Sequence, residues 1–391
     1  MLKVFFEILF WIIFFLIVFH YVGFSLLVFI LNQFFKKNHV NGDENNDNMP
    51  SVSLIIAAYN EEKIIKQKLL NDLKLDYPHN KIEIIVVSDG SSDNTPHLVE
   101  SLSDKNIISL FQPKRKGKTA ALNRAVRIAK NEILIFSDAN SFFNKDAIKK
   151  LVRHFSDDSI GGVCGQKSIL QSADRKASAG DRLYWLYESK LKQAESNLGS
   201  IPAADGEIFA LRKSLYSEIP EFIINDDLAL TLEIIKNKKR IIFDIEAITA
   251  EAASMTLQDD FNVKARMVYG SLQIQFIYKK YLNPFKSWFG FQYLSHKVLR
   301  HYMWMLLIAI FILNLTILIF SVNTFYTLFF VLQCAFYIFA IIGLLLDKLN
   351  VHSILFYLPY YYCNVNFAAA KGFTFFINQK SNVDIWKKAQ R

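Results

Sequence analysis

A long apolar run at the N-terminus constrains this chain more than any other feature. Within Ile8–Leu31 only His20 is clearly polar. A run of this length can cross a membrane as a helix. It exceeds the apolar part of a typical signal peptide and ends in no small-residue cleavage site. We therefore expect residues 1–35 to form a retained transmembrane helix. Lys36 and Lys37 follow it directly, which predicts that the next domain is cytoplasmic.

Apolar runs near the C-terminus predict further membrane helices. Val298–Phe320 and Phe325–Leu346 are each long enough to span a membrane. A third run, Ile354–Ile377, is interrupted by two asparagines and a lysine. We therefore predict two or three transmembrane helices within residues 298–378.

Three other segments flank or join these parts. Residues 36–50 are polar and are expected to form a flexible linker. Residues 279–297 place several aromatic side chains on one helical face, which indicates an amphipathic helix in the membrane interface. Residues 379–391 form a basic tail.

The middle of the chain, residues 51–278, has a different pattern. Short apolar runs rich in Ile and Val alternate with stretches of helical periodicity, as in sheets of buried parallel strands. This alternation predicts an α/β domain with a mostly parallel sheet and helices on both faces. The predicted strands are Val52–Ala58, Ile82–Val87, Ile107–Phe111 and Ile133–Phe136, and the predicted helices cover residues 61–74, 95–103 and 118–129.

Charge and cysteine content narrow the classes of partner. The net charge is +9, but the basic residues are dispersed and show no zinc-finger spacing. We therefore expect lipid headgroups and a diphosphate ligand, and no nucleic acid. The three cysteines lie far apart in the sequence, so they predict neither a disulfide framework nor a metal site.

Acidic residues follow three of the four predicted strands. Because ligands of such sheets bind beyond the carboxyl ends of the strands, these acids are expected at one edge. Carboxylates there can hold a ribose, a base or a hard divalent cation. Each acid alone could equally cap a helix or form a turn, but together they favour a nucleotide and cation site. They are Glu61 after the first strand, Asp89 and Asp93 after the second, and Asp138, with Asn140 beside it, after the fourth.

Two predicted helix starts add further candidates. Lys118 stands at the mouth of one helix, where backbone amides and a lysine can bind a diphosphate. The preceding Arg115 and Lys116 are interpreted as solvated. Asp226 and Asp227 open another helical stretch, where one acid can cap the helix and the other can act as a general base.

Taken in order, these motifs resemble family 2 glycosyltransferases, especially the membrane-integrated synthases of cellulose, hyaluronan and poly-N-acetylglucosamine. The resemblance runs from Val52 to about Gly270. It implies a GT-A-like, Rossmann-related domain inserted between N-terminal and C-terminal transmembrane helices. It also implies a nucleotide-sugar donor, such as a UDP-sugar, and Mg²⁺ or Mn²⁺ as cofactor.

The resemblance also assigns a role to each motif. It places the cation on Asp138 and Asn140. It places the catalytic base at Asp227, with Asp226 beside it. The residues expected at the donor are Ala58, Tyr59, Glu61, Asp89, Asp93, Lys118 and Asn123, and those expected at the acceptor or the diphosphate are Asp205, Gly206 and Arg266.

Two positions depart from the family pattern. Asn140 stands in place of the second metal-binding carboxylate, which keeps an oxygen ligand but removes a charge. Processive synthases carry a Q-x-x-R-W motif near the membrane. Here residues 263–267 keep only its arginine, Arg266, and Met267 replaces the tryptophan. This difference favours addition of one or a few sugars to a lipid-linked acceptor.

The expected function is that of a multi-pass inverting glycosyltransferase of the plasma or inner membrane. It would transfer a sugar to a growing glycan or a lipid-linked acceptor in cell-envelope or extracellular polysaccharide synthesis. One alternative is a polyprenyl-phosphate sugar synthase, which needs no sugar acceptor site; Asp226, Asp227 and Arg266 argue against it. Another is a membrane scaffold or transport component with an inactive domain, which retention of Lys118 and the acids disfavours.

Overall fold

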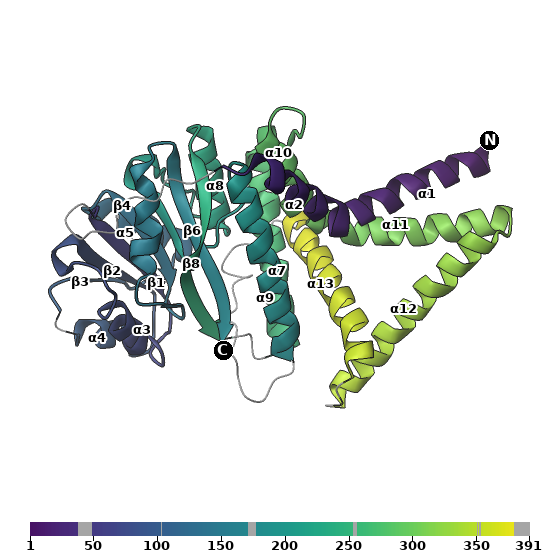
Figure 1. The fold of residues 1–391 in the computed structure, drawn as a ribbon. Helices are drawn as coiled ribbons and strands as arrows, with labels where there is room; N and C mark the ends of the chain where they lie inside the picture. The colour runs from purple at the N-terminus through teal and green to yellow at the C-terminus, as the bar shows by residue number, and fades with distance from the viewer. Residues whose placement is uncertain are drawn as a thin grey trace.

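The computed structural model describes residues 1–37, 49–102, 104–170, 177–252, 256–349, 351 and 353–378. Most of the expected linker and the whole basic tail lie outside these residues. Along the chain, a sheet domain comes between an N-terminal helix and a set of C-terminal helices. In space, these terminal helices lie together on one side of the sheet domain (Figure 1). This arrangement confirms the predicted α/β domain between apolar terminal helices.

One eight-stranded sheet has the order β3-β2-β1-β4-β7-β6-β8-β5 in the described part of the chain. β1 to β4 pair in parallel, as do β6 and β8, whereas β7 and β5 run antiparallel to their neighbours. The mostly parallel sheet is therefore confirmed. The strands are β1 Val52–Ala58, β2 Ile82–Asp89, β3 Ile107–Gln112, β4 Ile133–Asp138, β5 Phe142–Phe143, β6 Ile160–Leu170, β7 Phe209–Arg212 and β8 Arg240–Ala252.

Helices cover both faces of the sheet, each over its own apolar core. One core joins the sheet to α3, α4 and α6, and the other joins it to α5 and α8. The parallel register brings Ala58 opposite Ser88, and Ala57 opposite Asp138, so the exits of β1, β2 and β4 share one edge. The helices are α3 Ile65–Asp72, α4 Thr95–Glu100, α5 Lys118–Ile128, α6 Ala147–Val152, α7 Ala177–Leu198, α8 Asp226–Lys236 and α9 Leu257–Ile277.

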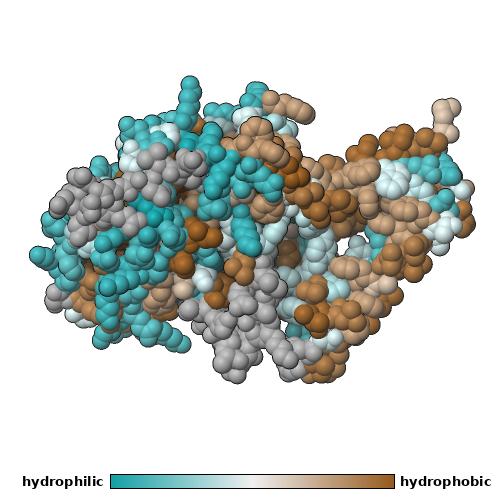
Figure 2. Space-filling view, in the orientation of Figure 1, coloured by the Kyte–Doolittle hydropathy of each residue, from teal (hydrophilic) through white to brown (hydrophobic). Residues whose placement is uncertain are grey.

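Three helices in the described residues are long and apolar enough to cross a membrane: Leu2–Phe35, Trp288–Phe320 and Thr324–Lys348. The first comprises α1 (Leu2–Val18), the π-helical turn η1 (Phe19–Gly23) and α2 (Phe24–Phe35). Side chains of α1 pack on α11 (Leu299–Phe320). Figure 2 shows hydrophobic residues covering these helices and hydrophilic residues covering the sheet domain.

The last helix differs from these spans. α13 (Ile354–Ile377) contains Pro359 and follows α12 (Thr324–Lys348). Its Gly372 packs against Ala265 and Val268 of α9, so closely that an added Cβ would lie 2.7 Å from the Ala265 carbonyl oxygen. Part of α13 therefore docks on the sheet domain.

The amphipathic helix expected over residues 279–297 is interrupted. A short 3₁₀ turn is followed by Pro284, and a new helix starts only at Trp288, where Ser287 Oγ accepts a hydrogen bond from Gly290 N. That helix, α10 (Trp288–Gln292), continues through the π-helical turn η7 (Tyr293–Val298) into α11. Phe289 and Tyr293 are buried in the core beside α9 instead of facing lipid.

Candidate active site

Hydrogen bonds lock the exits of β1 and β2 together. Asn60 N donates to Ser91 Oγ (3.1 Å), and Glu61 N donates to Thr95 Oγ1 (2.8 Å). The Asp93 carboxylate accepts from the backbone N–H groups of Glu62 (3.1 Å) and Thr95 (3.0 Å). Asp93 thus stabilises the local backbone, which agrees with the capping or turn role that each acid could have on its own. Glu61 lies at the sheet edge, shortly after Ala58 at the end of β1.

Asp89 fixes the loop that leads into α5. Its buried carboxylate accepts hydrogen bonds from Lys116 N (3.0 Å) and Gly117 N (2.7 Å). Gly117 has a φ of 102°, a conformation that side chains with a Cβ rarely adopt. This turn places Lys118 in the first position of α5.

Arg115 has a partner that the sequence interpretation missed. Its guanidinium carbon lies 3.7 Å from the centre of the Tyr59 ring, a cation–π contact. Arg115 also passes so close to Gly90 that an added Cβ there would meet its backbone at 2.6 Å. Arg115 is therefore part of the wall of the site, not a solvated residue.

Lys118 stands between two carboxylates from different elements. Its Nζ lies 2.7 Å from Asp138 Oδ1, at the end of β4, and 3.9 Å from Asp226 Oδ1, at the start of α8. Burial disfavours the charged form of Lys118, but Asp138 and Asp226 outweigh it and raise its pKa. The structure thus brings together three residues that the sequence predicted for one site.

Asp227 lies beside this group. Its Oδ1 accepts from Leu228 N (2.7 Å), and its Oδ2 accepts from Gly206 N (3.2 Å). Burial, and then the neighbouring Asp226, raise the pKa of Asp227 to about 7, although Lys118 opposes the shift. Burial also raises the pKa of Asp226. A carboxyl group with a pKa near neutrality is well matched to general-base work.

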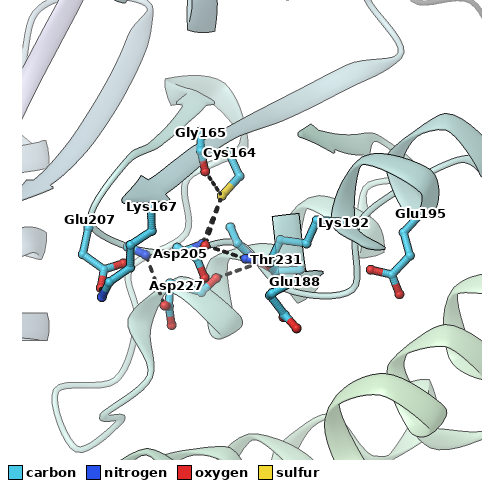
Figure 3. Close-up of polar contacts among 12 residues, drawn as sticks. Cys164, Gly165, Lys167, Glu188, Lys192, Glu195, Asp205, Glu207, Asp227 and Thr231 are labelled. Atoms are coloured by element: carbon cyan, nitrogen blue, oxygen red, sulfur yellow. Dashed lines mark hydrogen bonds and ion pairs between the residues drawn. The ribbon is translucent and has the colours of Figure 1, made fainter. Parts of the chain in front are cut away.

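The loop that holds Asp227 is itself held at three successive N–H groups (Figure 3). Ala204 N donates to Thr231 Oγ1 (3.1 Å), Asp205 N to Cys164 Sγ (3.2 Å), and Gly206 N to Asp227. A Cβ added at Gly206 would lie 3.5 Å from Lys118 Nζ. Gly206 therefore lies between the lysine and the candidate base.

Other predicted residues are engaged elsewhere. The carboxamide of Asn123 is buried, donates to Ile219 O (2.7 Å) and accepts from Tyr216 Oη (2.6 Å). The carboxylate of Asp205 pairs with Lys192 of α7. Arg266 lies on α9 and is partly exposed. The carbonyl of the adjacent Met267 accepts from Asn225 (2.9 Å), so α9 touches the start of α8.

An ion cluster beside Asn140 was not predicted. The Asn140 amide donates to Glu251 Oε2 (3.5 Å), and Lys167 pairs with both Glu251 and Glu207 (2.6 Å to Glu207 Oε1). Lys167 lies opposite Thr249 in the β6–β8 pairing, so Glu251, two residues on, lies on the same face. Glu207 directly follows Gly206, which the resemblance assigns to the acceptor or the diphosphate.

The donor set fits a cation that binds together with a phosphate ligand. No group of three or more His, Cys, Asp or Glu side chains able to hold a metal occurs in the described residues. Asp138 and Asn140 offer one carboxylate and one carboxamide at the sheet edge. Mg²⁺ is commonly held by one or two carboxylates, with substrate phosphates completing its shell.

Comparison with known families agrees with this geometry. Residues 53–220 match the family model described as glycosyl transferase family 2. These residues form a family 2 glycosyltransferase domain. The resemblance indicated by the ordered motifs is thus confirmed, and the family 2 domain contains the exits of β1, β2 and β4 together with Lys118 and Gly206.

Relatives extend the similarity beyond the family 2 domain. The chain is 28% identical over 264 residues to a probable glycosyltransferase, YdaM, of Bacillus subtilis, covering 64% of this chain and 61% of that protein. It is 25% identical over 237 residues to a poly-beta-1,6-N-acetyl-D-glucosamine synthase of Staphylococcus aureus, covering 59% of this chain and 57% of the synthase. The chain therefore spans only about three fifths of the length of these relatives.

One solved structure resembles nearly the whole chain. A mannosyltransferase from Pyrobaculum calidifontis, solved in complex with GDP-Man and Mn²⁺, aligns with a TM-score of 0.71 over 95% of this chain and 100% of that chain. At 20% sequence identity, this likeness establishes a shared GT-A-like fold.

Proposed function

We propose that this chain is a membrane-bound, inverting glycosyltransferase that moves a sugar from a nucleotide-sugar donor to a hydroxyl group of a glycan or lipid-linked acceptor. The observation that carries the proposal is the convergence of Lys118 and Asp138, at one sheet edge of the family 2 domain, with the Asp226–Asp227 pair at the start of α8. Such a transfer needs a cation that offsets the charge of the leaving diphosphate and a base that accepts the proton of the acceptor hydroxyl.

The donor would lie along the exits of β1, β2 and β4. Tyr59, stacked under Arg115, is suited to line the pocket for the base or ribose, with Ala58, Glu61 and Asp89 nearby. Lys118 faces the position of the diphosphate, where its ammonium would offset the charge of the leaving group. Asp138 and Asn140 would hold Mg²⁺ or Mn²⁺, which supplies further neutralisation of that charge. The Mn²⁺ and GDP-Man bound by the Pyrobaculum enzyme support both assignments.

The chemical step would rely on Asp227. As the acceptor oxygen attacks the anomeric carbon, its proton passes to the Asp227 carboxylate. The bond from the anomeric carbon to the diphosphate oxygen breaks, and its electron pair leaves with the diphosphate. The raised pKa of Asp227, caused by burial and Asp226, suits a hydroxyl nucleophile. A polyprenyl phosphate is already deprotonated and would need no base, so Asp227 favours a hydroxyl acceptor.

Turnover of nucleotide sugars tests the proposal. The full chain in detergent should hydrolyse or transfer at least one member of a panel of UDP- and GDP-sugars, and Asp138→Ala should abolish this turnover. If no donor is turned over, or if turnover is unchanged in Asp138→Ala, the assignment fails. Preferential transfer to polyprenyl phosphate instead of sugar or lipid hydroxyls would favour the synthase alternative.

The proposed location is the cell membrane, with the family 2 domain in the cytoplasm. Lys36 and Lys37 after the first span support this orientation. In a variant lacking native cysteines, Val322→Cys, between α11 and α12 and 84% exposed, should react with an impermeant thiol reagent added to intact cells. Protection until the cells are lysed would contradict the orientation.

A further inference from the structure

Charged side chains of the second apolar span meet two carboxylates of α7 inside the protein. Glu188 Oε1 lies 2.7 Å from Lys297 Nζ, and Glu188 Oε2 lies 3.2 Å from His296 Nε2. Arg300 Nη2 is 3.6 Å from the same Glu188 oxygen. The other ring nitrogen of His296 lies 3.0 Å from Glu195 Oε1. We refer to these five residues as the α7 charge cluster.

The α7 charge cluster is buried, and its central carboxylate is ionised. The side chains of Glu188 and His296 are each 4% exposed, and that of Glu195 is fully buried. Burial opposes ionisation of Glu188, but Lys297 and then His296 outweigh it and hold its pKa well below the usual range. Because charges lose their hydration on burial, such pairs add little net stability compared with apolar side chains of similar volume. Ionisable residues in a membrane span commonly serve a function instead.

Two π-helical turns meet beside the α7 charge cluster. η7 contains His296 and Lys297, and η1 of the first span contains His20. His20 Nδ1 lies within hydrogen-bond distance of the Ser295 carbonyl oxygen (3.1 Å), so the two turns contact each other. π-helical turns are rare and occur frequently at functional sites. Both spans thus depart from regular α-helix at the level where apolar side chains of α7 pack on them.

α7 connects these spans with the loop that contacts the candidate base. One helical turn after Glu188, Lys192 pairs with Asp205. The next residue, Gly206, donates its N–H to Asp227 (3.2 Å). In Figure 3, Lys192 extends from α7 toward Asp205, whereas the two glutamates of the cluster point in another direction. A single helix therefore contacts both the membrane spans and the loop beside Asp227.

The charges fix α7 in one register along the spans. Apolar contacts are non-directional, whereas buried polar contacts can specify a register, as a single asparagine does in coiled coils. A shift of α7 by one turn, about 5.4 Å, would separate Glu188 from Lys297 and Lys192 from Asp205 at the same time. The position of the loop is thus tied to the position of the spans.

We propose that Glu188 is a positioning residue, and that the α7 charge cluster holds the loop of Asp205 and Gly206 against Asp227 at a fixed place relative to the membrane spans. This inference rests on the proposed function, in which Asp227 must meet the hydroxyl of a glycan or lipid-linked acceptor. Without the cluster, the loop and the carboxylate would lose their alignment. Donor binding should persist, because the turn that places Lys118 is ordered by Asp89.

Hydrogen exchange of the full chain in detergent, followed by mass spectrometry, tests the position of the loop. The N–H groups of residues 204–206 donate to Thr231, Cys164 and Asp227. In Glu188→Gln they should exchange about tenfold faster, the scale of weakening one hydrogen bond. Wild-type exchange of these groups in the folded variant would overturn the inference.

Asp244→Asn provides a matched control. Asp244 is a buried carboxylate of β8 that pairs with His154 (2.6 Å) and Arg153 (2.8 Å), so removing its charge also disturbs a buried ion cluster. This variant should lower Tm but leave exchange of residues 204–206 unchanged. Equal acceleration in both variants would show a general loss of stability and contradict a positioning role for Glu188.

Kinetics with a donor selected from the nucleotide-sugar panel give a second readout. Glu188→Gln should lower kcat by about 10- to 100-fold, because a displacement of about 1 Å can have an effect of this size. The Kd of the donor should stay near wild type. An unchanged kcat would overturn the inference. If the wild type turns over no donor, the proposed function fails, and hydrogen exchange alone decides whether Glu188 positions the loop.

The double variant Glu188→Gln/Lys297→Met separates positioning from stability. It removes one charge of each sign, so its Tm should recover and it should fold even if Glu188→Gln does not. Fast exchange of residues 204–206 and the low kcat should persist, because α7 still lacks its contact with the span. If exchange and kcat return to wild type together with Tm, Glu188 acts on stability alone and the inference is wrong.

Discussion

Lys118 Nζ, at the start of α5, lies 2.7 Å from Asp138 Oδ1, at the end of β4. In the proposed reaction both groups serve the diphosphate, Lys118 directly and Asp138 through a cation. These two side chains pair with each other in the free protein. Binding of the donor and the cation would replace this ion pair with contacts from Lys118 to the diphosphate and from Asp138 to the cation. Ligand and cation should therefore bind together instead of independently.

Lys118→Met should weaken donor binding. A hydrogen bond to a charged group contributes about 1.5–3 kcal/mol, so we expect Kd for the nucleotide sugar to rise by about 10- to 100-fold. Lys114→Met provides a control, because Lys114 is an exposed residue of the same basic segment. Isothermal titration calorimetry of both variants would measure the difference. Equal affinities of the two variants would place the diphosphate elsewhere.

Asp138→Asn should lower the affinity for the cation and for the donor together. The carboxamide keeps an oxygen ligand but loses the charge that holds a divalent ion. Mn²⁺ titration followed by electron paramagnetic resonance, with and without nucleoside diphosphate, measures this directly. Full transfer activity in the presence of a chelator would contradict the assignment of Asp138.

Asp227→Asn should keep donor binding near wild type but lower sugar transfer by at least ~100-fold, the scale of losing a general base. The carboxamide has a similar size, and its one oxygen can still accept from either Gly206 N or Leu228 N, but it cannot take the proton. Normal transfer by this variant would move the base to Asp226.

The pH dependence follows from the same residue. Burial and Asp226 raise the pKa of Asp227 to about 7, and only the ionised form accepts a proton. The kcat/KM of the wild type should therefore level off above pH 7 and fall about tenfold per pH unit below it. A profile that stays flat down to pH 5 would show that Asp227 does not act as the base.

The parallel strands β1 to β4 could be predicted because each of them is marked by its own short apolar run in the sequence. β1, for example, forms over Val52–Ala58, the bounds that its apolar run predicted. The antiparallel half could not be predicted in the same way. β7 pairs with β4 and β6 across long sequence separations, and no turn signal joins these strands.

The candidate site was predicted where one strand exit or helix start presents the residue, as for Asp138, Lys118 and Asp227. It was not predicted where a residue depends on a distant partner. Arg115 looks solvated until Tyr59 is placed beneath it, and Glu251 joins the site only through the β6–β8 register. Asn123 matches the family motif, yet its amide is occupied by Tyr216 and Ile219.

Lys192 provides a prediction about stability. Its side chain is 2% exposed, and its ammonium group pairs with Asp205, whose side chain is 20% exposed. Lys192→Met keeps a similar apolar volume but leaves the Asp205 carboxylate without its cation. Removing one partner of a buried pair costs about 3–5 kcal/mol. Since Asp205 is partly solvated, we expect about 3 kcal/mol, seen as a lower Tm in detergent. Arg127→Met, at an exposed pair with Glu218, should leave Tm nearly unchanged.

The double variant Lys192→Met/Asp205→Asn separates loss of the pair from loss of packing. It removes both charges, so no uncompensated carboxylate remains, and buried pairs replaced as a whole often cost little. Its Tm should therefore recover most of the loss seen in Lys192→Met. The asparagine keeps the backbone N–H that binds Cys164 Sγ (3.2 Å), so the loop that presents Gly206 to Asp227 should retain its shape and transfer should recover as well. If the double variant is as unstable as Lys192→Met, the apolar stem of Lys192, not its charge, stabilises this loop.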